Sequence, residues 1–94
     1  MITVSVSYHN MLQRRTGVDR ETIVLSEATS LYSALQRLAD RYGPNLREML
    51  FAADETVATH LVVFRNGQLA RQDARGLQLA DGDELMLFPA ISGG

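Results

Sequence analysis

The sequence predicts a small α+β domain in which a mixed sheet packs on one main helix. Three observations lead to this fold class. Apolar residues alternate with polar ones in both halves of the chain, a single apolar stripe at helical spacing lies between the two alternating regions, and 46% of the 94 residues are hydrophobic. We assign residues 1–89 to this domain and residues 90–94 to a flexible C-terminal tail.

Two strands are predicted in the N-terminal third. Apolar residues alternate with Thr and Ser over residues 2–8, and a second alternating run covers residues 21–26. This period of two indicates strands that each bury one face. The stretch 9–19 between them is polar and contains Gly17, so we expect a long connection within a hairpin.

One main helix is predicted after these strands. Thr29 or Ser30 provides the N-cap, and Gly43-Pro44 ends the helix because proline cannot continue it. Its apolar stripe contains Leu31, Ala34, Leu35, Leu38 and Tyr42. Leucine and methionine residues over 46–50 then indicate one or two further helical turns, and residues 52–59 are predicted as a loop.

The second half of the chain is predicted as three more strands. Residues 60–65 form the first, and Asn66-Gly67 suits the positive φ angles of a type I′ turn. Residues 68–71 should therefore fold back as a short edge strand. The sequence Asp81-Gly82-Asp83 marks another turn, and residues 84–89 form the last strand.

Composition excludes several functional classes. The net charge is −2 and the sequence pI about 5.5, which gives no electrostatic attraction for nucleic acid or an anionic membrane. No apolar run is long enough for a membrane span, and Met1 leads straight into a strand pattern without a basic signal segment. We therefore expect a cytoplasmic protein with no nucleic-acid or membrane partner.

The reactive side chains do not form a catalytic or metal-binding pattern. Cysteine is absent, which excludes disulfides, thiolate catalysis and cysteine ligands. His9 and His60 are far apart in the sequence, and no Ser/His/Asp set or phosphate-binding glycine pattern is found. All 9 basic residues are arginine, so no side-chain amine can accept an isopeptide bond. These features predict a protein substrate with no bound cofactor, not an enzyme.

The Gly93-Gly94 end is the feature that most directly suggests a function. Glycine has no Cβ, so two glycines leave a thin segment that can enter a narrow channel in another protein. Gly94 would then present its carboxylate to a partner's active site. Ile91, Ser92 and Gly93 would be threaded with it. The alternative is an accidental pair of glycines on an adaptor domain.

Strand parity predicts an apolar face on which a partner can dock. In the third and last strands, Leu61, Val63, Leu85 and Leu87 should face the helix. The candidate docking residues, which lie on the opposite face or at its end, are Val62, Phe64, Met86, Phe88 and Pro89. The alternative is a second minor core covered by loop residues such as Met11 and Leu12. Arg14 and Arg15 could contact an acidic partner, although exposed arginines are more often simply solvated.

The end of the chain carries a specific family resemblance. Residues Asp81–Leu85 read DGDEL, Leu87–Gly94 read LFPAISGG and Val62–Gly67 read VVFRNG. Together with the order of elements, these motifs resemble the MoaD/ThiS family of sulfur carriers, which have the β-grasp fold of ubiquitin-like proteins. The sequence departs from the family at Ala90, where a second proline is common, and at Ser92, where alanine or threonine is common.

The resemblance implies a chemical role for the C-terminal carboxylate. An adenylating, E1-like enzyme would use ATP to activate Gly94, and a sulfur donor would convert it to a thiocarboxylate. The resemblance favours the small subunit of molybdopterin synthase, with the large subunit as acceptor. Two alternatives stay open: a sulfur carrier for cysteine, thiamin or secondary-metabolite biosynthesis, and a ubiquitin-like modifier attached through Gly94 to lysines of other proteins.

Overall fold

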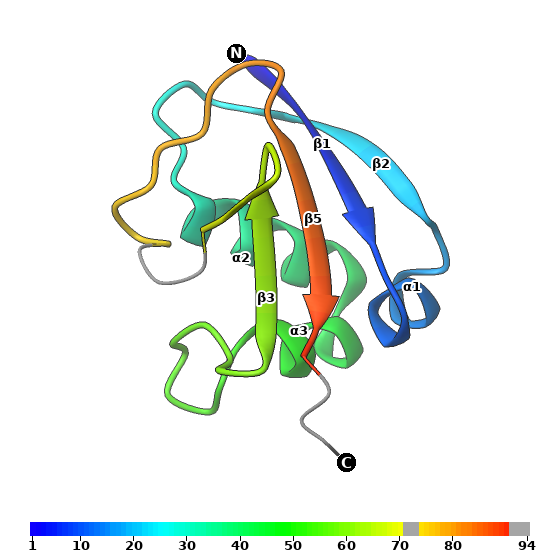
Figure 1. Cartoon of the computed structure of the whole chain (residues 1–94). Coiled ribbons are helices and arrows are strands. Elements are labelled where there is room, and N and C mark those ends of the chain that lie inside the picture. Colours follow the sequence, from blue (N-terminus) through cyan, green and yellow to red (C-terminus); the bar gives the residue numbers. More distant parts are fainter. Residues whose placement is uncertain (71–73, 91–94) are drawn as a thin grey trace.

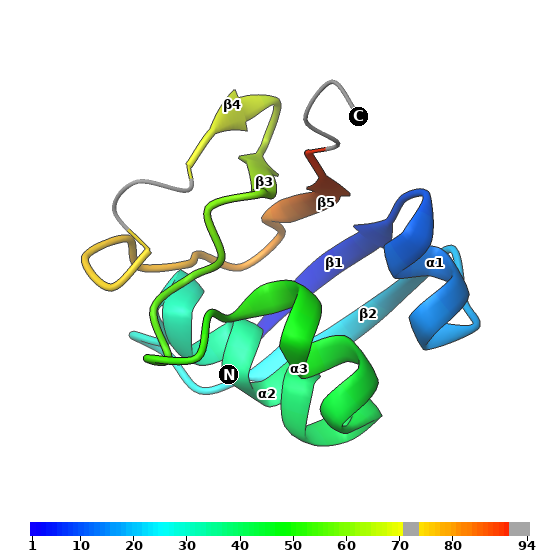
Figure 2. The ribbon, with the colours of Figure 1, turned by 90° about the horizontal axis from the view of Figure 1, so that it is seen from below.

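The computed structural model describes residues 1–70 and 74–90, which form one sheet with helices against one of its faces (Figures 1 and 2). The strands are β1 (Ile2–Tyr8), β2 (Arg20–Leu25), β3 (Leu61–Arg65), β4 (Gln68–Leu69) and β5 (Glu84–Pro89). The helices are α1 (Met11–Thr16), α2 (Leu31–Tyr42) and α3 (Pro44–Leu50). The predicted α+β class is confirmed.

The sheet is mixed, as predicted, and its last strand lies in the centre. The strand order is β2-β1-β5-β3-β4. β5 is parallel to β1 and antiparallel to β3, and the other pairs are antiparallel. Because β5 lies between β1 and β3, the chain leaves the sheet from its middle and not from an edge (Figure 1).

The main helix α2 begins and ends where the sequence predicts. The Ser30 hydroxyl accepts a hydrogen bond from the Ser33 backbone N–H, which caps the first turn. At the other end Gly43 has a φ of 87°, which favours glycine, and Pro44 follows it at the start of α3. Leu35 and Leu38 of the predicted stripe have no exposed surface.

The connection between β1 and β2 contains a helix that the sequence analysis did not predict. Residues 11–16 form α1, and Gly17 ends it in the left-handed conformation while its N–H bonds to the Gln13 carbonyl. Leu12 is the one buried residue of this helix. Because a single buried residue gives no apolar periodicity, the pattern looked like a polar loop.

One hydrophobic core lies between the sheet and the helices. Figure 2 shows α2 and α3 together on the same side of the strands, and the core joins side chains from the helices to the inward side of the sheet. The face of the whole sheet turned away from α2 and α3 is the one toward the viewer in Figure 1. It is called the open face below.

The Asn66-Gly67 turn takes the predicted form, with φ angles of 51° and 84° at its two central residues. The edge strand that follows is shorter than expected. β4 ends at Leu69, and Arg71 of the predicted strand lies outside the described residues. The predicted tail residues Ile91, Ser92, Gly93 and Gly94 also lie outside the described part of the chain.

Candidate docking surface and tail base

The two faces of β3 and β5 are divided as strand parity predicts. On the helix side, Leu61, Val63, Leu85 and Leu87 are at most 1% exposed. On the open face, Val62, Phe64, Met86 and Phe88 are only half-buried. The register places Val62 opposite Phe88 and Phe64 opposite Met86, so the four side chains are neighbours in space.

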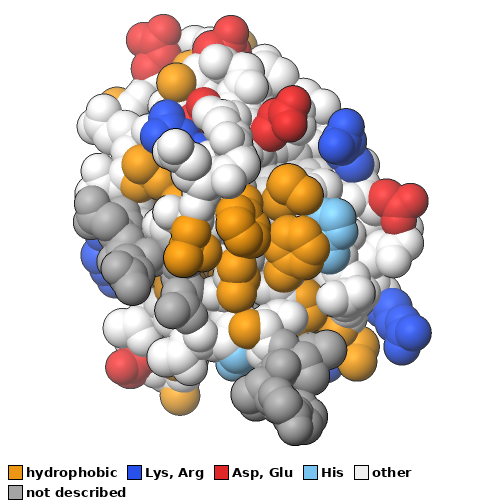
Figure 3. Space-filling model, viewed as in Figure 1, with side chains coloured by type: hydrophobic (Ala, Val, Ile, Leu, Met, Phe, Trp, Pro, Cys, Tyr) orange, Lys and Arg blue, Asp and Glu red, His pale blue; other side chains and the backbone are white. Residues whose placement is uncertain are grey.

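No second core covers the open face within the described chain. Met11 is 44% exposed, and Leu12 belongs to the main core instead. Figure 3 shows hydrophobic side chains gathered in one patch on this face, with the charged side chains around them. The four side chains are thus partly exposed and are not enclosed in a second core within the described chain, and partner docking on them stays a prediction.

Pro89 does not belong to this exposed surface. It is buried, and the register pairs it with Leu61. The reason is parity, because residue 89 points to the same side of β5 as Leu85 and Leu87. The expectation that Pro89 belongs to the docking residues rested on its place in the chain, and the burial of its side chain corrects it.

Two residues that the sequence analysis did not assign to this face extend the patch. Leu69 lies opposite Phe64 in the β3–β4 hairpin and is 60% exposed. The His9 ring stacks on the Phe88 ring, with 4.2 Å between their centroids. The type I′ turn could have identified Leu69, but His9 reaches Phe88 only because β1 pairs with β5. These residues form what we call the open-face patch: His9, Val62, Phe64, Leu69, Met86 and Phe88.

Ring contacts give the open-face patch a defined shape. The Phe64 and Phe88 rings meet edge to face, with their centroids 5.8 Å apart. On the other side of Phe88, His9 Nε2 lies 3.1 Å from the Ser7 hydroxyl, which fixes the imidazole against the sheet. Phe88 is therefore held between two rings at the centre of the patch.

The base of the tail lies directly beside this patch. The Ala90 N–H donates a hydrogen bond to the His60 carbonyl, so the pairing of β5 with the start of β3 continues one residue into the predicted tail. Phe88 is two residues earlier on β5. Residues 91–94 follow Ala90, and an extended chain of that length spans at most about 14 Å.

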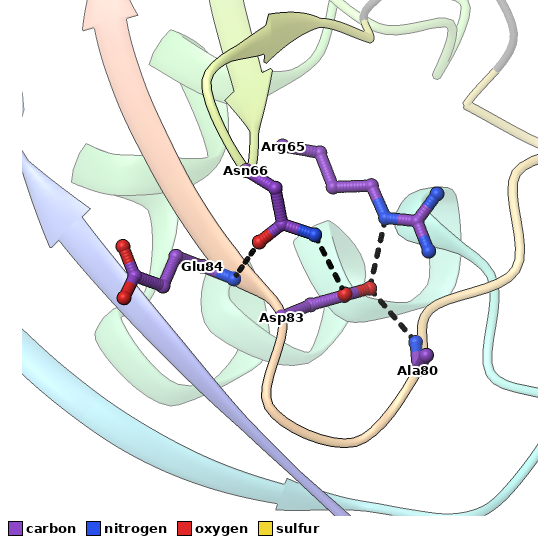
Figure 4. Close-up of polar contacts among 5 residues, drawn as sticks. All are labelled: Arg65, Asn66, Ala80, Asp83 and Glu84. Atoms are coloured by element: carbon purple, nitrogen blue, oxygen red, sulfur yellow. Dashed lines mark hydrogen bonds and ion pairs between the residues drawn. The ribbon is translucent and has the colours of Figure 1, made fainter.

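A polar network fixes the opposite end of β5 (Figure 4). The Asp83 carboxylate is 6% exposed and accepts hydrogen bonds from Arg65 Nε at 2.8 Å, Asn66 Nδ2 at 2.9 Å and the Ala80 N–H at 2.8 Å. The Asn66 side-chain oxygen in turn accepts from the Glu84 N–H at 2.9 Å. The network joins the Asn-Gly turn to the Asp-Gly-Asp turn and so sets the β3–β5 register.

The environment of Asp83 favours its ionised form. Desolvation by burial would raise the pKa of this carboxyl, but the hydrogen bonds from Ala80, Asn66 and Arg65, together with the charge of Arg65, outweigh it. The pKa of Asp83 is therefore lowered. This carboxylate has a structural role, because every donor that it contacts belongs to the two turns.

A second carboxylate, that of the partly buried Glu21, joins the sheet to α2. The phenol groups of Tyr8 and Tyr42 both donate to Glu21 Oε2, and Arg41 pairs with Glu21 Oε1 at 3.3 Å. Desolvation and the hydrogen bond to Glu21 raise the pKa of Tyr8 and of Tyr42. The two phenols are therefore held as neutral donors, and this cluster also stabilises the fold.

The described residues include no group of three or more His, Cys, Asp or Glu side chains that could hold a metal ion. Across residues 1–70 and 74–90, no helix is long and apolar enough to cross a membrane. The candidate site combines an apolar patch with Ala90, from which the predicted Gly-Gly tail continues.

Comparison with known proteins gives the same class. The profile of the ThiS family matches residues 6–94, and the chain belongs to this family. The fold and the family together define a small ubiquitin-like domain of the carrier and modifier class. The matched region runs through the Gly-Gly end.

A curated relative and several solved structures are similar to the chain. Small archaeal modifier protein 1 of Haloferax volcanii is 45% identical over 51 residues, which is 54% of this chain and 55% of the relative. The match thus spans about half the length of that relative. Its crystal structure superposes over 98% of this chain and 99% of its own, with a TM-score of 0.85 and 30% identity.

Two further structures extend the comparison. A putative molybdopterin converting factor, subunit 1, from Pyrococcus furiosus covers 97% of this chain and 100% of its own, with a TM-score of 0.75 and 25% identity. The BexX/CysO complex of Amycolatopsis orientalis contains a chain with a TM-score of 0.71 and 22% identity, covering 97% of this chain and 99% of its own. At that identity, the second similarity supports the fold alone.

Proposed function

We propose that the protein is a sulfur carrier whose Gly94 carboxylate is adenylated and then converted to a thiocarboxylate. The observation that carries this proposal is the position of the open-face patch directly beside the tail base at Ala90. A partner that grips the patch has the tail within reach of its active site. Membership of the ThiS family supports the same role.

The chemistry needs no reactive side chain from this chain. The Gly94 carboxylate attacks the α-phosphorus of ATP on the activating enzyme, which forms an acyl adenylate and releases pyrophosphate. A sulfide-equivalent donor then attacks the carbonyl carbon, so that a carbon–sulfur bond forms while the bond to AMP breaks. The resulting thiocarboxylate is an anionic nucleophile that an acceptor enzyme can use.

For the acceptor, we propose the large subunit of a molybdopterin synthase, with this chain as the small subunit. The similarity to the Pyrococcus furiosus protein supports this choice. Cysteine, thiamin or secondary-metabolite biosynthesis would require the same tail chemistry with a different acceptor. A genomic neighbour that encodes one of these acceptors would distinguish the pathways.

The experiment is to incubate the protein with an adenylating enzyme from the same genome, ATP and a sulfide donor. Mass spectrometry should show one terminal oxygen replaced by sulfur. Deleting Gly94 should prevent this change. Adding one residue after Gly94 should also prevent it, because the carboxylate moves by about 3.3 to 3.6 Å. Equal adenylation of a tail that lacks both glycines would contradict the proposal.

A second candidate function is protein modification. It is favoured by the similarity to small archaeal modifier protein 1. In that case, peptide mapping after reaction in a cell extract should find Gly94 joined to lysines of other proteins. Chains linked through lysines of the protein itself are excluded, because the sequence contains none.

A further inference from the structure

Two charged residues of opposite sign lie at different borders of the open-face patch. Arg20 is the first residue of β2 and Glu84 is the first residue of β5, and both are exposed. Neither forms an ion pair with any part of the described chain. The other described strand positions on this face are uncharged.

Arg20 lies at one end of a row that crosses the whole sheet. The register pairs Arg20 with Ser7, Ser7 with Met86, Met86 with Phe64, and Phe64 with Leu69. Because residues in register share a face, the row passes from a cation through a hydroxyl to three apolar side chains. Two strand spacings separate Arg20 from Met86, which is about 10 Å.

Glu84 lies at a second border of the patch, along the strand and not across it. It is two residues before Met86 on β5, which is about 7 Å at the rise of a strand. The backbone N–H of Glu84 donates a hydrogen bond to Asn66 Oδ1, but the Glu84 carboxylate points away from the Asp83 network in Figure 4. The carboxylate is therefore available to a partner.

No ion pair within the described chain involves Arg20. A shallow hollow between β1, α1 and β2 is lined by His9, Asp19 and Arg20 among others. The Asp19 carboxylate accepts a hydrogen bond from the Gln13 side chain, and no ion pair joins it to Arg20.

We infer that Arg20 and Glu84 orient the partner on the open-face patch. The partner that fits is a protein with an apolar surface for the patch, an acidic group facing Arg20 and a basic group facing Glu84. This inference rests on the proposed function. The apolar contact alone would tolerate rotation of the partner, whereas two opposite charges at different borders favour one orientation, in which the tail base faces the partner's channel.

The effect is expected mainly in the rate of association. Exposed charges at the border of an interface steer the encounter and set its orientation, and they add little to final affinity. Salt screens such contacts, because the Debye length falls to roughly 8 Å at physiological ionic strength. The contribution of Arg20 and Glu84 should therefore decrease as salt is added.

The test exchanges the two charges without changing the net charge. The double variant Arg20→Glu/Glu84→Arg keeps the total at −2 but reverses the pattern on the open face. The control is Arg37→Glu/Glu27→Arg, which makes the same exchange at exposed positions on α2 and in the turn after β2, and which also removes the exposed ion pair of Glu27 with the Met1 amino group. Association with the adenylating enzyme from the same genome is measured by stopped flow at low and high salt.

The exchange on the open face should slow association roughly tenfold at low salt, and the control should associate at the wild-type rate. The difference should shrink at high salt. If both double variants behave like wild type, or if both are slowed equally, the inference is wrong. Should the double variant fail to fold, Arg20→Gln and Glu84→Gln, tested separately against Arg37→Gln, should each show a smaller slowing.

Adenylation of the wild-type protein in the same assay separates the two proposals. If the wild-type protein is adenylated and the exchanged variant associates at the wild-type rate, only the orienting role of the two charges is contradicted. No wild-type adenylation would contradict the proposed function, and the orienting role would fail with it.

Discussion

Leu87 and Phe88 are adjacent on β5 and lie on opposite faces of the sheet. Leu87 has no exposed surface and belongs to the core under α2 and α3. Phe88 is half-buried between His9 and Phe64 on the open face. Both are large and apolar, yet only one of them completes the core of the domain.

This difference would let one strand serve stability on one face and, as we propose, recognition on the other. The helix side buries its side chains against the rest of the same chain, whereas the open face leaves a group of apolar side chains with little to cover them. Such a patch marks a site for another protein when it is continuous and bordered by polar groups. Substitutions on the two faces should therefore have different consequences.

The largest expected effect on stability is on the helix side. Leu87→Ala removes a fully buried side chain and leaves a cavity, so the free energy of unfolding should fall by about 2 to 5 kcal/mol. Urea denaturation followed by circular dichroism measures this loss. A loss near zero would show that the core does not depend on this face of β5.

The open face should lose binding rather than stability. Phe88→Asp places a charge at the centre of the patch, where a partner would have to desolvate it, so binding to the activating enzyme should weaken by at least about 2 kcal/mol, or roughly 30-fold. Val24→Asp is the matched control, because Val24 is also exposed on this face but lies on β2. Isothermal titration calorimetry distinguishes the two variants.

The contradictory result for the Phe88 variant would be unchanged binding, or weakening equal to that of the Val24 variant. Collapse of the fold would show instead that the open face belongs to a core. Circular dichroism of both variants before the binding measurement separates these outcomes.

A smaller effect on stability is expected at the Asp83 network, which fixes the register of β3 and β5. Asp83→Asn removes a charge from the network with Arg65 and Asn66, and the free energy of unfolding should fall by about 2 kcal/mol at pH 7. A slip of one residue would exchange the two faces of β5, so this network protects the separation described above.

The same variant predicts a pH dependence. Because the folded pKa of Asp83 is lowered, its stabilisation is complete above the unfolded value of about 3.9 and is lost as the pH falls through the folded value. The stability difference between wild type and Asp83→Asn should therefore narrow below about pH 4. A difference that stays constant down to pH 2 would contradict the role of the ionised carboxylate.

The smallest expected effect is in the β3–β4 turn. Gly67 has a φ of 84°, and an added Cβ would meet no other atom within 4 Å. Gly67→Ala should therefore cost only the conformational strain, about 1 kcal/mol, without a clash. Denaturation measures it, and a stabilised variant would show that the turn is not held in this conformation.

Most of the fold could be predicted from the sequence because local patterns determine its main elements. The stripe of α2, its Ser30 cap and the Asn66-Gly67 turn each depend on nearby residues, and all three were predicted. α1 was not, because Leu12 alone gives no periodicity. Helices with one buried residue are formed by tertiary packing, which local patterns do not record.

The candidate site was predicted only as far as strand parity allowed. Alternation identified four side chains on one face, but it could not show whether another layer covered them. These are Val62, Phe64, Met86 and Phe88. His9 joins the patch through the pairing of β1 with β5, a long-range contact without a local signal. Pro89 was misplaced because its position beside the tail was given more weight than its parity.

The most direct test of the account separates docking from delivery in one variant. One glycine is inserted between Ala90 and Ile91, which leaves the open-face patch intact and moves the Gly94 carboxylate by about 3.3 to 3.6 Å. Affinity for the activating enzyme should match wild type, whereas the rate of adenylation should fall roughly 100-fold, because a misplacement of even 1 Å can cost that much. If the inserted variant is adenylated at the wild-type rate, or if it no longer binds the activating enzyme, the view that the patch docks and the tail delivers is contradicted.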